Sequence, residues 1–140
     1  MRLFVNREQM LDKLLKKAQE GKHTFEIGSN SDLVLENTIT DNLPWTIENF
    51  GKPEKGFITF PTKFNMVDDI LDINHKGRTI VRMSVNPEKI INEIELGTSP
   101  LELRLEAVNK LYHAGYKIGI LIAPVIFLDN WKNMYTELLD

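Results

Sequence analysis

The sequence contains no cysteine. Without thiolates the chain cannot form a disulfide, offer a cysteine nucleophile, or ligate an iron–sulfur cluster or a cysteine-type zinc ion. Its three histidines, His23, His75 and His113, also lack the i,i+4 spacing that lets two imidazoles of one helix share a metal ion. We therefore expect no metal site built from this chain.

Long apolar runs and an excess of one charge are missing as well. The longest apolar run, residues 118–127, contains Pro124 and is shorter than the roughly 20 residues of a membrane-spanning helix. Residues 1–10 lack the apolar core of a signal peptide. The chain has 17 Lys and Arg against 20 Asp and Glu, a net charge of −3, which argues against a broad phosphate-binding surface. These observations predict a cytoplasmic protein without a membrane partner.

The hydrophobic periodicity predicts strands and helices in alternation, without a repeat, linker or low-complexity segment. The predicted strands are residues 24–27, 56–60, 79–85 and 117–122, and the predicted helices are residues 7–20, 45–50, 66–71 and 131–139, with two more starting near residues 86 and 100. Residues 33–42, rich in Asn, Asp and Thr, are expected to be irregular. Such alternation is typical of parallel βαβ units. The fold class is therefore α/β with a parallel sheet, in a single domain of residues 1–140.

Two helix starts carry recognisable capping signals. Asn86 before Pro87 is typical of an N-cap followed by proline at the first helical position. The stretch from Ser99 to Glu102 matches a capping box. The helix that follows is expected to bury the stripe Leu101, Leu105, Val108, Leu111 and Tyr112.

Polar residues follow the predicted strands where each one ends. Ser29, Ser31 and Asp32 follow the first strand, Lys63 the second, and Ser84 and Asn86 the third. Ligands of α/β proteins bind at this end of the sheet, so a small-molecule site is expected there. Ser31 and Asp32 could accept hydrogen bonds from an amine or a ribose hydroxyl, and Lys63 could pair with a carboxylate.

A simpler interpretation of these residues also exists. Residues 30–32 could be only a capping or turn cluster, Lys63 a solvated loop residue and Ser84 a strand-end hydroxyl. Glu26 and Arg82, charged residues inside strand patterns, could line a cavity or occupy the polar face of half-buried strands. The sequence has no GxSxG, no phosphate-binding GxxxxGKS/T and no GxGxxG, which lowers the weight of acyl transfer, nucleotide hydrolysis and hydride transfer.

A set of separated strings closely resembles the middle of the spore photoproduct lyase family of radical S-adenosylmethionine enzymes. The strings are Phe25-Glu26 leading to Ser31-Asp32, then Thr62-Lys63-Phe64, Arg82-Met83-Ser84-Val85-Asn86, Gly97-Thr98-Ser99-Pro100-Leu101, Arg104-Leu105-Glu106-Ala107, Ala114-Gly115-Tyr116 and Ile122-Ala123-Pro124. They agree in order and spacing over residues 24–139, which makes the resemblance specific.

The resemblance implies a partial TIM barrel, a [4Fe–4S] cluster bound by a CxxxCxxC motif, and cleavage of S-adenosylmethionine to a radical that repairs a thymine dimer of spore DNA. It also implies that Ser31, Asp32, Lys63 and Ser84 contact S-adenosylmethionine. Ser29 stands where the family carries a cysteine that returns a hydrogen atom to the product radical. A hydroxyl O–H bond is much stronger than a thiol S–H bond, so Ser29 would be a poor donor. Either the parent is a family member with another substrate or donor, which is our hypothesis, or the cysteine was replaced.

The cluster motif would lie upstream of Met1, so the cluster is expected in the full-length parent and not in this chain. We therefore expect a central fragment of the barrel that is inert alone. Its expected partners are the rest of the barrel or a cluster-bearing chain, DNA for the parent, and a second copy through exposed sheet edges. Two alternatives are a non-catalytic module that binds S-adenosylmethionine, a nucleotide or a partner, and an unrelated α/β domain.

Overall fold

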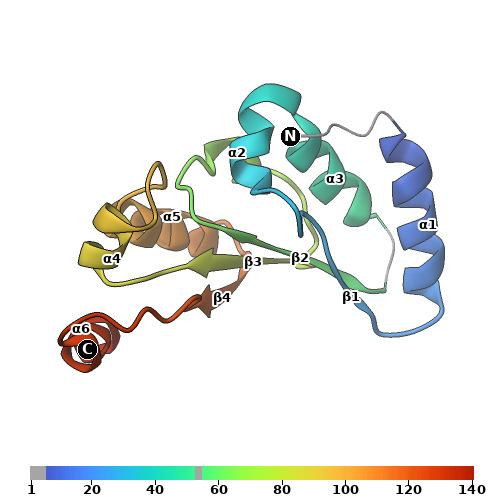
Figure 1. Ribbon diagram of the computed structural model, residues 1–140. Helices are drawn as coiled ribbons and strands as arrows, with labels where there is room; N and C mark the ends of the chain where they lie inside the picture. Colours follow the sequence, from blue (N-terminus) through green and yellow to red (C-terminus); the bar gives the residue numbers. More distant parts are fainter. Residues whose placement is uncertain (1–5, 53–54) are drawn as a thin grey trace.

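The computed structural model describes residues 6–52 and 55–140, and these form a four-stranded, fully parallel sheet (Figure 1). The strands are β1 (Thr24–Glu26), β2 (Phe57–Thr62), β3 (Thr79–Ser84) and β4 (Lys117–Leu121), in the spatial order β1-β2-β3-β4. The α/β class and the parallel sheet predicted from the alternating pattern are confirmed. Because each strand pairs with the one before it, the order is that of a (β/α) barrel.

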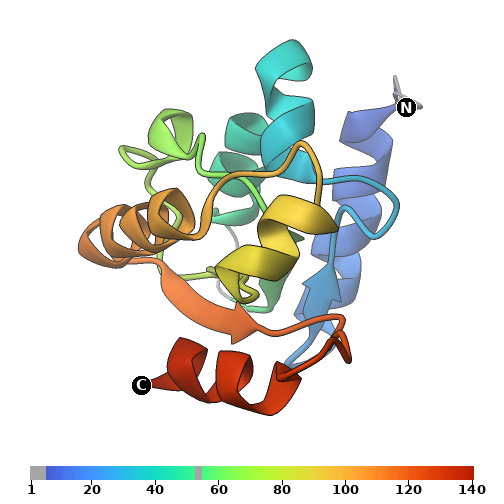
Figure 2. The same cartoon turned by 60° about the vertical axis from the view of Figure 1, so that its left-hand side comes forward.

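Helices precede, connect and follow the strands and contribute to the core (Figures 1 and 2). They are α1 (Arg7–Gln19), α2 (Leu33–Thr40), α3 (Asn42–Phe50), the 3₁₀ turn η1 (Asp68–Ile70), α4 (Glu88–Glu93), α5 (Leu101–His113) and α6 (Trp131–Leu139). Phe60 of β2 and Val81 of β3 are fully buried, and they pack in one cluster with Phe50 of α3 and Leu111 of α5. No helix of the described residues is both long and apolar enough to span a membrane.

Two segments differ from the sequence prediction. Residues 33–40, expected to be irregular, form α2, because the Asp32 side chain accepts hydrogen bonds from the first free amides of the helix. Residues 66–71, expected to be a helix, contain only η1. Val67 and Ile70 are both buried three positions apart, a spacing that one 3₁₀ turn satisfies without a longer helix.

The two capping signals are also wrong. Pro87 and Pro100 occupy the N-cap positions of α4 and α5, and neither helix has a side-chain cap. The Ser99 hydroxyl instead donates to Oδ1 of Asn65 at 2.7 Å. The side-chain amide of Asn86 donates to Oε1 of Glu95 at 2.8 Å. Contacts with distant residues have therefore replaced the local hydrogen bonds that the sequence pattern suggested.

The buried stripe of α5 is rotated relative to the prediction. Leu105 is 46% exposed and Tyr112 is 68% exposed, whereas Arg104, Ala107 and Leu111 are buried. A helix face can shift by one residue when a charged side chain finds enough partners inside the protein. Arg104 has such partners in Ser84, Thr98 and Ser99.

Candidate functional site

A cavity of about 400 Å³ lies where the carboxyl ends of the four strands meet. The loop after β1, the end of β2, the end of β3 and the start of the segment after β4 each contribute to its wall. Five of the six strand-end residues that the sequence singled out line this cavity: Ser29, Ser31, Asp32, Lys63 and Ser84. The sixth, Asn86, bonds instead to Glu95. The structure thus brings together a set that is spread over 56 positions of sequence, from 29 to 84.

Asp32 is engaged entirely with the protein. Its Oδ1 accepts hydrogen bonds from the backbone N–H of Val34 at 3.1 Å and of Leu35 at 3.4 Å, and from the Thr62 hydroxyl at 2.8 Å. Its Oδ2 accepts from the backbone N–H of Lys63 at 2.8 Å. These contacts match the simpler interpretation of this residue as a cap. They also tie the loop after β1 to the end of β2, where Lys63 begins.

The two serines of the same loop differ in their surroundings. Ser31 donates a hydrogen bond from its hydroxyl to Oε2 of Glu36 at 2.9 Å, while Ser29 is exposed at the edge of the cavity. The loop turns sharply at Gly28, which has a φ of +76° and no room for a side chain, since a Cβ there would lie 2.5 Å from Cγ of Leu33. Gly28 therefore allows Ser29 and Ser31 to reach the cavity.

Ser84 carries a buried hydroxyl with no hydrogen-bond partner among the described residues. The residue is 2% exposed, lies at the end of β3 and lines the cavity. Leaving a buried hydroxyl unsatisfied costs about 1–3 kcal/mol, so such groups are rare in native proteins. A polar group of a bound ligand would satisfy it, and the residues present therefore fit a polar small molecule.

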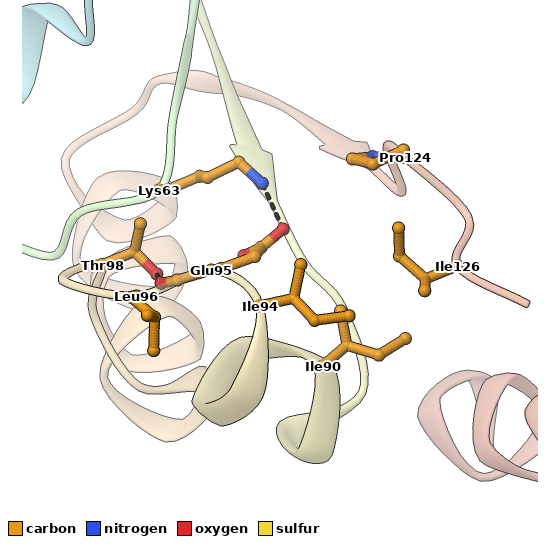
Figure 3. Close-up of a pocket in the computed structure, with 8 residues that line it drawn as sticks. All are labelled: Lys63, Ile90, Ile94, Glu95, Leu96, Thr98, Pro124 and Ile126. Atoms are coloured by element: carbon orange, nitrogen blue, oxygen red, sulfur yellow. Dashed lines mark hydrogen bonds and ion pairs between the residues drawn. The ribbon is translucent and has the colours of Figure 1, made fainter. Parts of the chain in front are cut away.

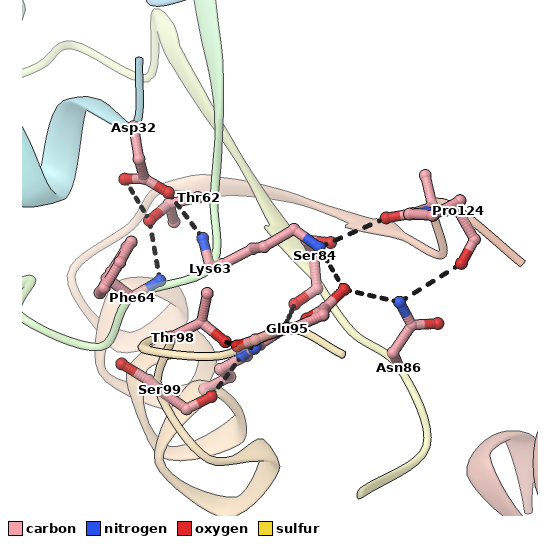
Figure 4. A network of polar contacts seen from close by, with 12 residues as sticks. Asp32, Thr62, Lys63, Phe64, Ser84, Asn86, Glu95, Thr98, Ser99 and Pro124 are labelled. Carbon is pink, nitrogen blue, oxygen red and sulfur yellow. Dashed lines mark hydrogen bonds and ion pairs between the residues drawn. The ribbon is translucent and has the colours of Figure 1, made fainter. Parts of the chain in front are cut away.

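Sequence reasoning missed the carboxylate at the centre of the site. Glu95, in the loop after α4, forms an ion pair with Nζ of Lys63 and accepts a hydrogen bond from Nδ2 of Asn86 at 2.8 Å (Figure 4). Its other oxygen lies 2.9 Å from Nη1 of Arg104, an ion pair without the alignment of a hydrogen bond. Burial by itself raises the pKa of Glu95, but these three contacts outweigh it and hold that pKa below the usual value of 4.5.

Arg104 is a fully buried cation beneath this carboxylate. Its guanidinium donates hydrogen bonds to the carbonyl oxygens of Ser99 at 2.7 Å and Ser84 at 3.0 Å, and to the hydroxyl of Thr98 at 2.6 Å. The fork geometry of arginine suits several acceptors at once. One signal could have found it, because Arg104 lies three positions after Leu101 and four before Val108, within the apolar stripe of α5.

A second cavity of about 320 Å³, whose lining residues are drawn in Figure 3, shares Lys63 with the first. Its wall is mostly apolar, formed by Ile90, Ile94, Leu96, Pro124 and Ile126, with Lys63, Glu95 and Thr98 on the polar side. Lys63 lines both cavities, and its ammonium group lies 3.5 Å from the carbonyl oxygen of Ala123. The lysine therefore lies in the wall of both cavities.

The two charged strand residues, Glu26 and Arg82, pair with each other. Nη2 of Arg82 donates to Oε2 of Glu26 at 2.6 Å across the middle of the sheet. Gly119 of β4, the register partner of Arg82, makes room for the arginine stem, since a Cβ there would lie 3.1 Å from Cγ of Arg82. Within residues 6–52 and 55–140, no group of three or more acidic or histidine side chains could hold a metal ion.

Comparison with known proteins finds similarity along the whole chain. Residues 1–140 match the family model described as spore photoproduct lyase. The spore photoproduct lyase of Bacillus subtilis (strain 168) is 38% identical over 143 residues, and that of Clostridium acetobutylicum is 33% identical over 142 residues. These matches cover 100% and 99% of this chain and 42% of each relative. The chain thus spans less than half the length of the curated relatives it matches.

Solved structures agree with the sequence matches. A spore photoproduct lyase complexed with dinucleoside spore photoproduct superposes with a TM-score of 0.92, and a double mutant with bound AdoMet and dinucleoside spore photoproduct with a TM-score of 0.93. Each is 36% identical and covers 98% of this chain and 41% of the solved one. Agreement at this coverage excludes a chance resemblance of an unrelated α/β domain.

Proposed function

Because this chain belongs to the spore photoproduct lyase family, we propose that it forms the S-adenosylmethionine-binding part of a radical enzyme that repairs thymine dimers in DNA. The observation that carries the proposal is the cavity at the strand ends, with the ammonium of Lys63 on one wall and, on another, the hydroxyl of Ser84, which has no partner in the described part of the chain. A relative solved with bound AdoMet supports this choice of ligand.

We propose a task for each of four residues that line the cavity. Lys63 supplies the positive charge for the ligand carboxylate, and Ser84 offers a hydroxyl that can donate or accept a hydrogen bond. Ser31 retains acceptor capacity for the ligand amine or ribose while it donates to Glu36. Asp32 lines the same cavity, and its four contacts assign it to holding the loop and the Lys63 backbone in place.

When bound and reduced, S-adenosylmethionine supplies the radical that abstracts hydrogen from the lesion. The chain contains no thiolate to ligate the [4Fe–4S] cluster that provides the electron, so its own residues do not fit that cluster. We propose that these 140 residues are inert without a cluster-bearing segment. Ser29 holds a hydroxyl proton at the cavity edge, and its strong O–H bond suits hydrogen bonding rather than hydrogen-atom donation.

The chain covers only 42% of the length of its relatives, so we propose that the missing part, or a separate chain in its place, is a partner. The rest of a barrel, or a separate cluster-bearing chain, would pair with the outer edges of β1 and β4, which among the described residues pair only with β2 and β3, respectively. DNA is the proposed partner of the complete enzyme in the cytoplasm. Without such a neighbour the edges favour self-association, and a clean monomer in light scattering at high concentration would contradict this.

Calorimetry with S-adenosylmethionine tests the binding proposal. We expect Lys63→Ala to weaken binding, and the matched variant Lys110→Ala, which removes a partly exposed lysine paired with Asp68, to leave it unchanged. Absence of binding at millimolar ligand would refute the proposal and leave a segment with a purely structural role.

A second candidate is a non-catalytic module that binds S-adenosylmethionine or a nucleotide, which the lack of cysteine favours. Sequencing the gene upstream of Met1 separates the two. A CxxxCxxC motif there supports the enzyme, and a stop codon in its place supports the module.

A further inference from the structure

The lysine that we propose as the carboxylate-binding group is fixed by the protein at both ends. Its backbone N–H donates to Asp32 and its carbonyl oxygen accepts from the backbone N–H of Ser99 at 3.1 Å. Its ammonium group forms the ion pair with Glu95 and lies near the carbonyl oxygen of Ala123. The side chain is 30% exposed, so its tip remains accessible from the cavities.

Glu95 is held much more rigidly than Lys63. Its side chain is 7% exposed and is fixed from below by Arg104, which is itself fully buried, and from the side by Asn86. Asn86 in turn accepts a hydrogen bond from the hydroxyl of Tyr135 in α6 at 3.0 Å. The carboxylate therefore has one position, set by α5, α6 and the end of β3, and the flexible lysine stem takes its position from the carboxylate.

The charges of this group leave a surplus for a ligand. Lys63 and Arg104 carry two positive charges and Glu95 one negative charge, so these three side chains have a formal charge of +1. The carboxylate of Asp32, in the wall of the same cavity, is taken up by backbone N–H groups and the Thr62 hydroxyl rather than by the Lys63 ammonium. Arg104 is fully buried and cannot meet a ligand, whereas Lys63 lines both cavities. The surplus charge is therefore presented at the lysine.

We infer that Glu95 is a positioning residue that holds the Lys63 ammonium at the wall shared by the two cavities and so determines where the carboxylate of the ligand binds. This inference rests on the proposed function, since it acts through the proposed ligand contact of Lys63. Glu95 itself touches no ligand in this assignment. Its effect on binding must pass through the lysine, and this requirement makes it testable.

The substitution Glu95→Gln keeps the size of the side chain and removes its charge. An amide has one acceptor oxygen, so it cannot accept from Lys63 on one side and face Arg104 on the other. The partly exposed lysine is the partner that can leave. Glu95→Asp is a second variant, which keeps the charge for Arg104 but shortens the reach to Lys63, and circular dichroism verifies that each variant is folded.

The test is a double-mutant cycle measured by calorimetry on the 140-residue chain, with S-adenosylmethionine and its decarboxylated analogue as ligands. For S-adenosylmethionine we expect Lys63→Ala to weaken binding about tenfold or more and Glu95→Gln about three- to tenfold. In the Lys63→Ala background, Glu95→Gln should change the dissociation constant less than twofold. The analogue, which lacks the carboxylate, should respond less than twofold to each substitution. Asp68→Asn, at a surface ion pair, is the control.

The outcomes separate the two proposals. If the unaltered chain binds neither ligand, the proposed function fails and the inference fails with it. If it binds S-adenosylmethionine and Lys63→Ala weakens binding, but Glu95→Gln acts equally on both ligands or adds fully to Lys63→Ala, the positioning role alone is overturned. A merely structural glutamate would give that second result, because a general loosening of the site does not depend on the ligand carboxylate.

Discussion

Replacing Arg104 by methionine should destabilise the protein by about 3–5 kcal/mol, the usual cost of removing one partner of a buried ion pair. Arg104 is fully buried, and its loss would leave two backbone carbonyl oxygens, of Ser84 and Ser99, without their donor. Methionine fills most of the vacated volume, so the cavity contribution is small. Since domains are typically stable by about 5–15 kcal/mol, the variant should still fold at low temperature.

Urea unfolding monitored by circular dichroism measures this loss. The matched control is Lys110→Met, which removes the cation of a partly exposed pair with Asp68 and should cost about 0–1 kcal/mol. Glu95→Gln should be less harmful in the Arg104→Met background than in the original protein, because no buried cation then lacks its counter-charge. We expect the two losses to fall short of additivity by about 1–3 kcal/mol.

Two results would refute this reasoning. A loss below about 1 kcal/mol for Arg104→Met would mean that the buried guanidinium is not stabilised by the contacts seen around it. Strict additivity of the Glu95→Gln and Arg104→Met losses would mean that the two charges, 2.9 Å apart, do not depend on each other. Either result would also remove the rigid support that the positioning role of Glu95 requires.

Further predictions concern the loop, the open sheet face and the pH range. Asp32→Ala removes the cap of α2 and the acceptor of the Lys63 N–H, so we expect about 2–3 kcal/mol lower stability in urea unfolding; a loss no larger than that of an ordinary cap, about 1 kcal/mol, would contradict the anchoring role. Gly119→Ala places a Cβ 3.1 Å from Cγ of Arg82 and should lower the melting temperature by a few degrees, whereas no change would mean that the arginine stem moves freely. The pKa of Glu95 is lowered in the folded state, so its contribution to stability is present above pH 4.5 and is lost as the pH falls through the native pKa; urea unfolding between pH 3 and 6 should show this loss, and Glu95→Gln should flatten it. Burial raises the pKa of Tyr116, so its contribution is present below pH 10.0 and is lost at higher pH, and Tyr116→Phe should remove that alkaline dependence.

Much of the fold followed from local patterns. Strand periodicity and the turn residues between strands are properties of a few consecutive side chains, and they located all four parallel strands and hence the edge where Ser29, Ser31, Asp32, Lys63 and Ser84 meet. Polar residues at the ends of parallel strands must converge, whatever the helices between them do. The family resemblance rested on the same residues.

The errors arose where distant residues compete with local ones. Asn86 and Ser99 carry capping signals, but they bond to Tyr135 and Asn65, which lie 49 and 34 residues away, and do not cap the helices that follow them. In α5 the pattern favoured Leu105 for the core, and the structure buries Arg104 because acceptors at the end of β3 and in the loop of residues 95–99 surround it. The Ser84 acceptor lies 20 residues before Arg104, beyond the reach of a local helix pattern.

The sequence by itself therefore determined the α/β class, the strand ends that form the cavity and the residue types that line it. Only the tertiary structure decided how these residues are used: Asp32 as an anchor, Ser84 with a buried hydroxyl that meets no partner within residues 6–52 and 55–140, and Lys63 held by Glu95 above Arg104. The physical reason is that a buried charge is stable only beside a counter-charge and donors or acceptors. The partners of Glu95 include Lys63, 32 residues before it, and Asn86, 9 residues before it. Folding alone brings these side chains together.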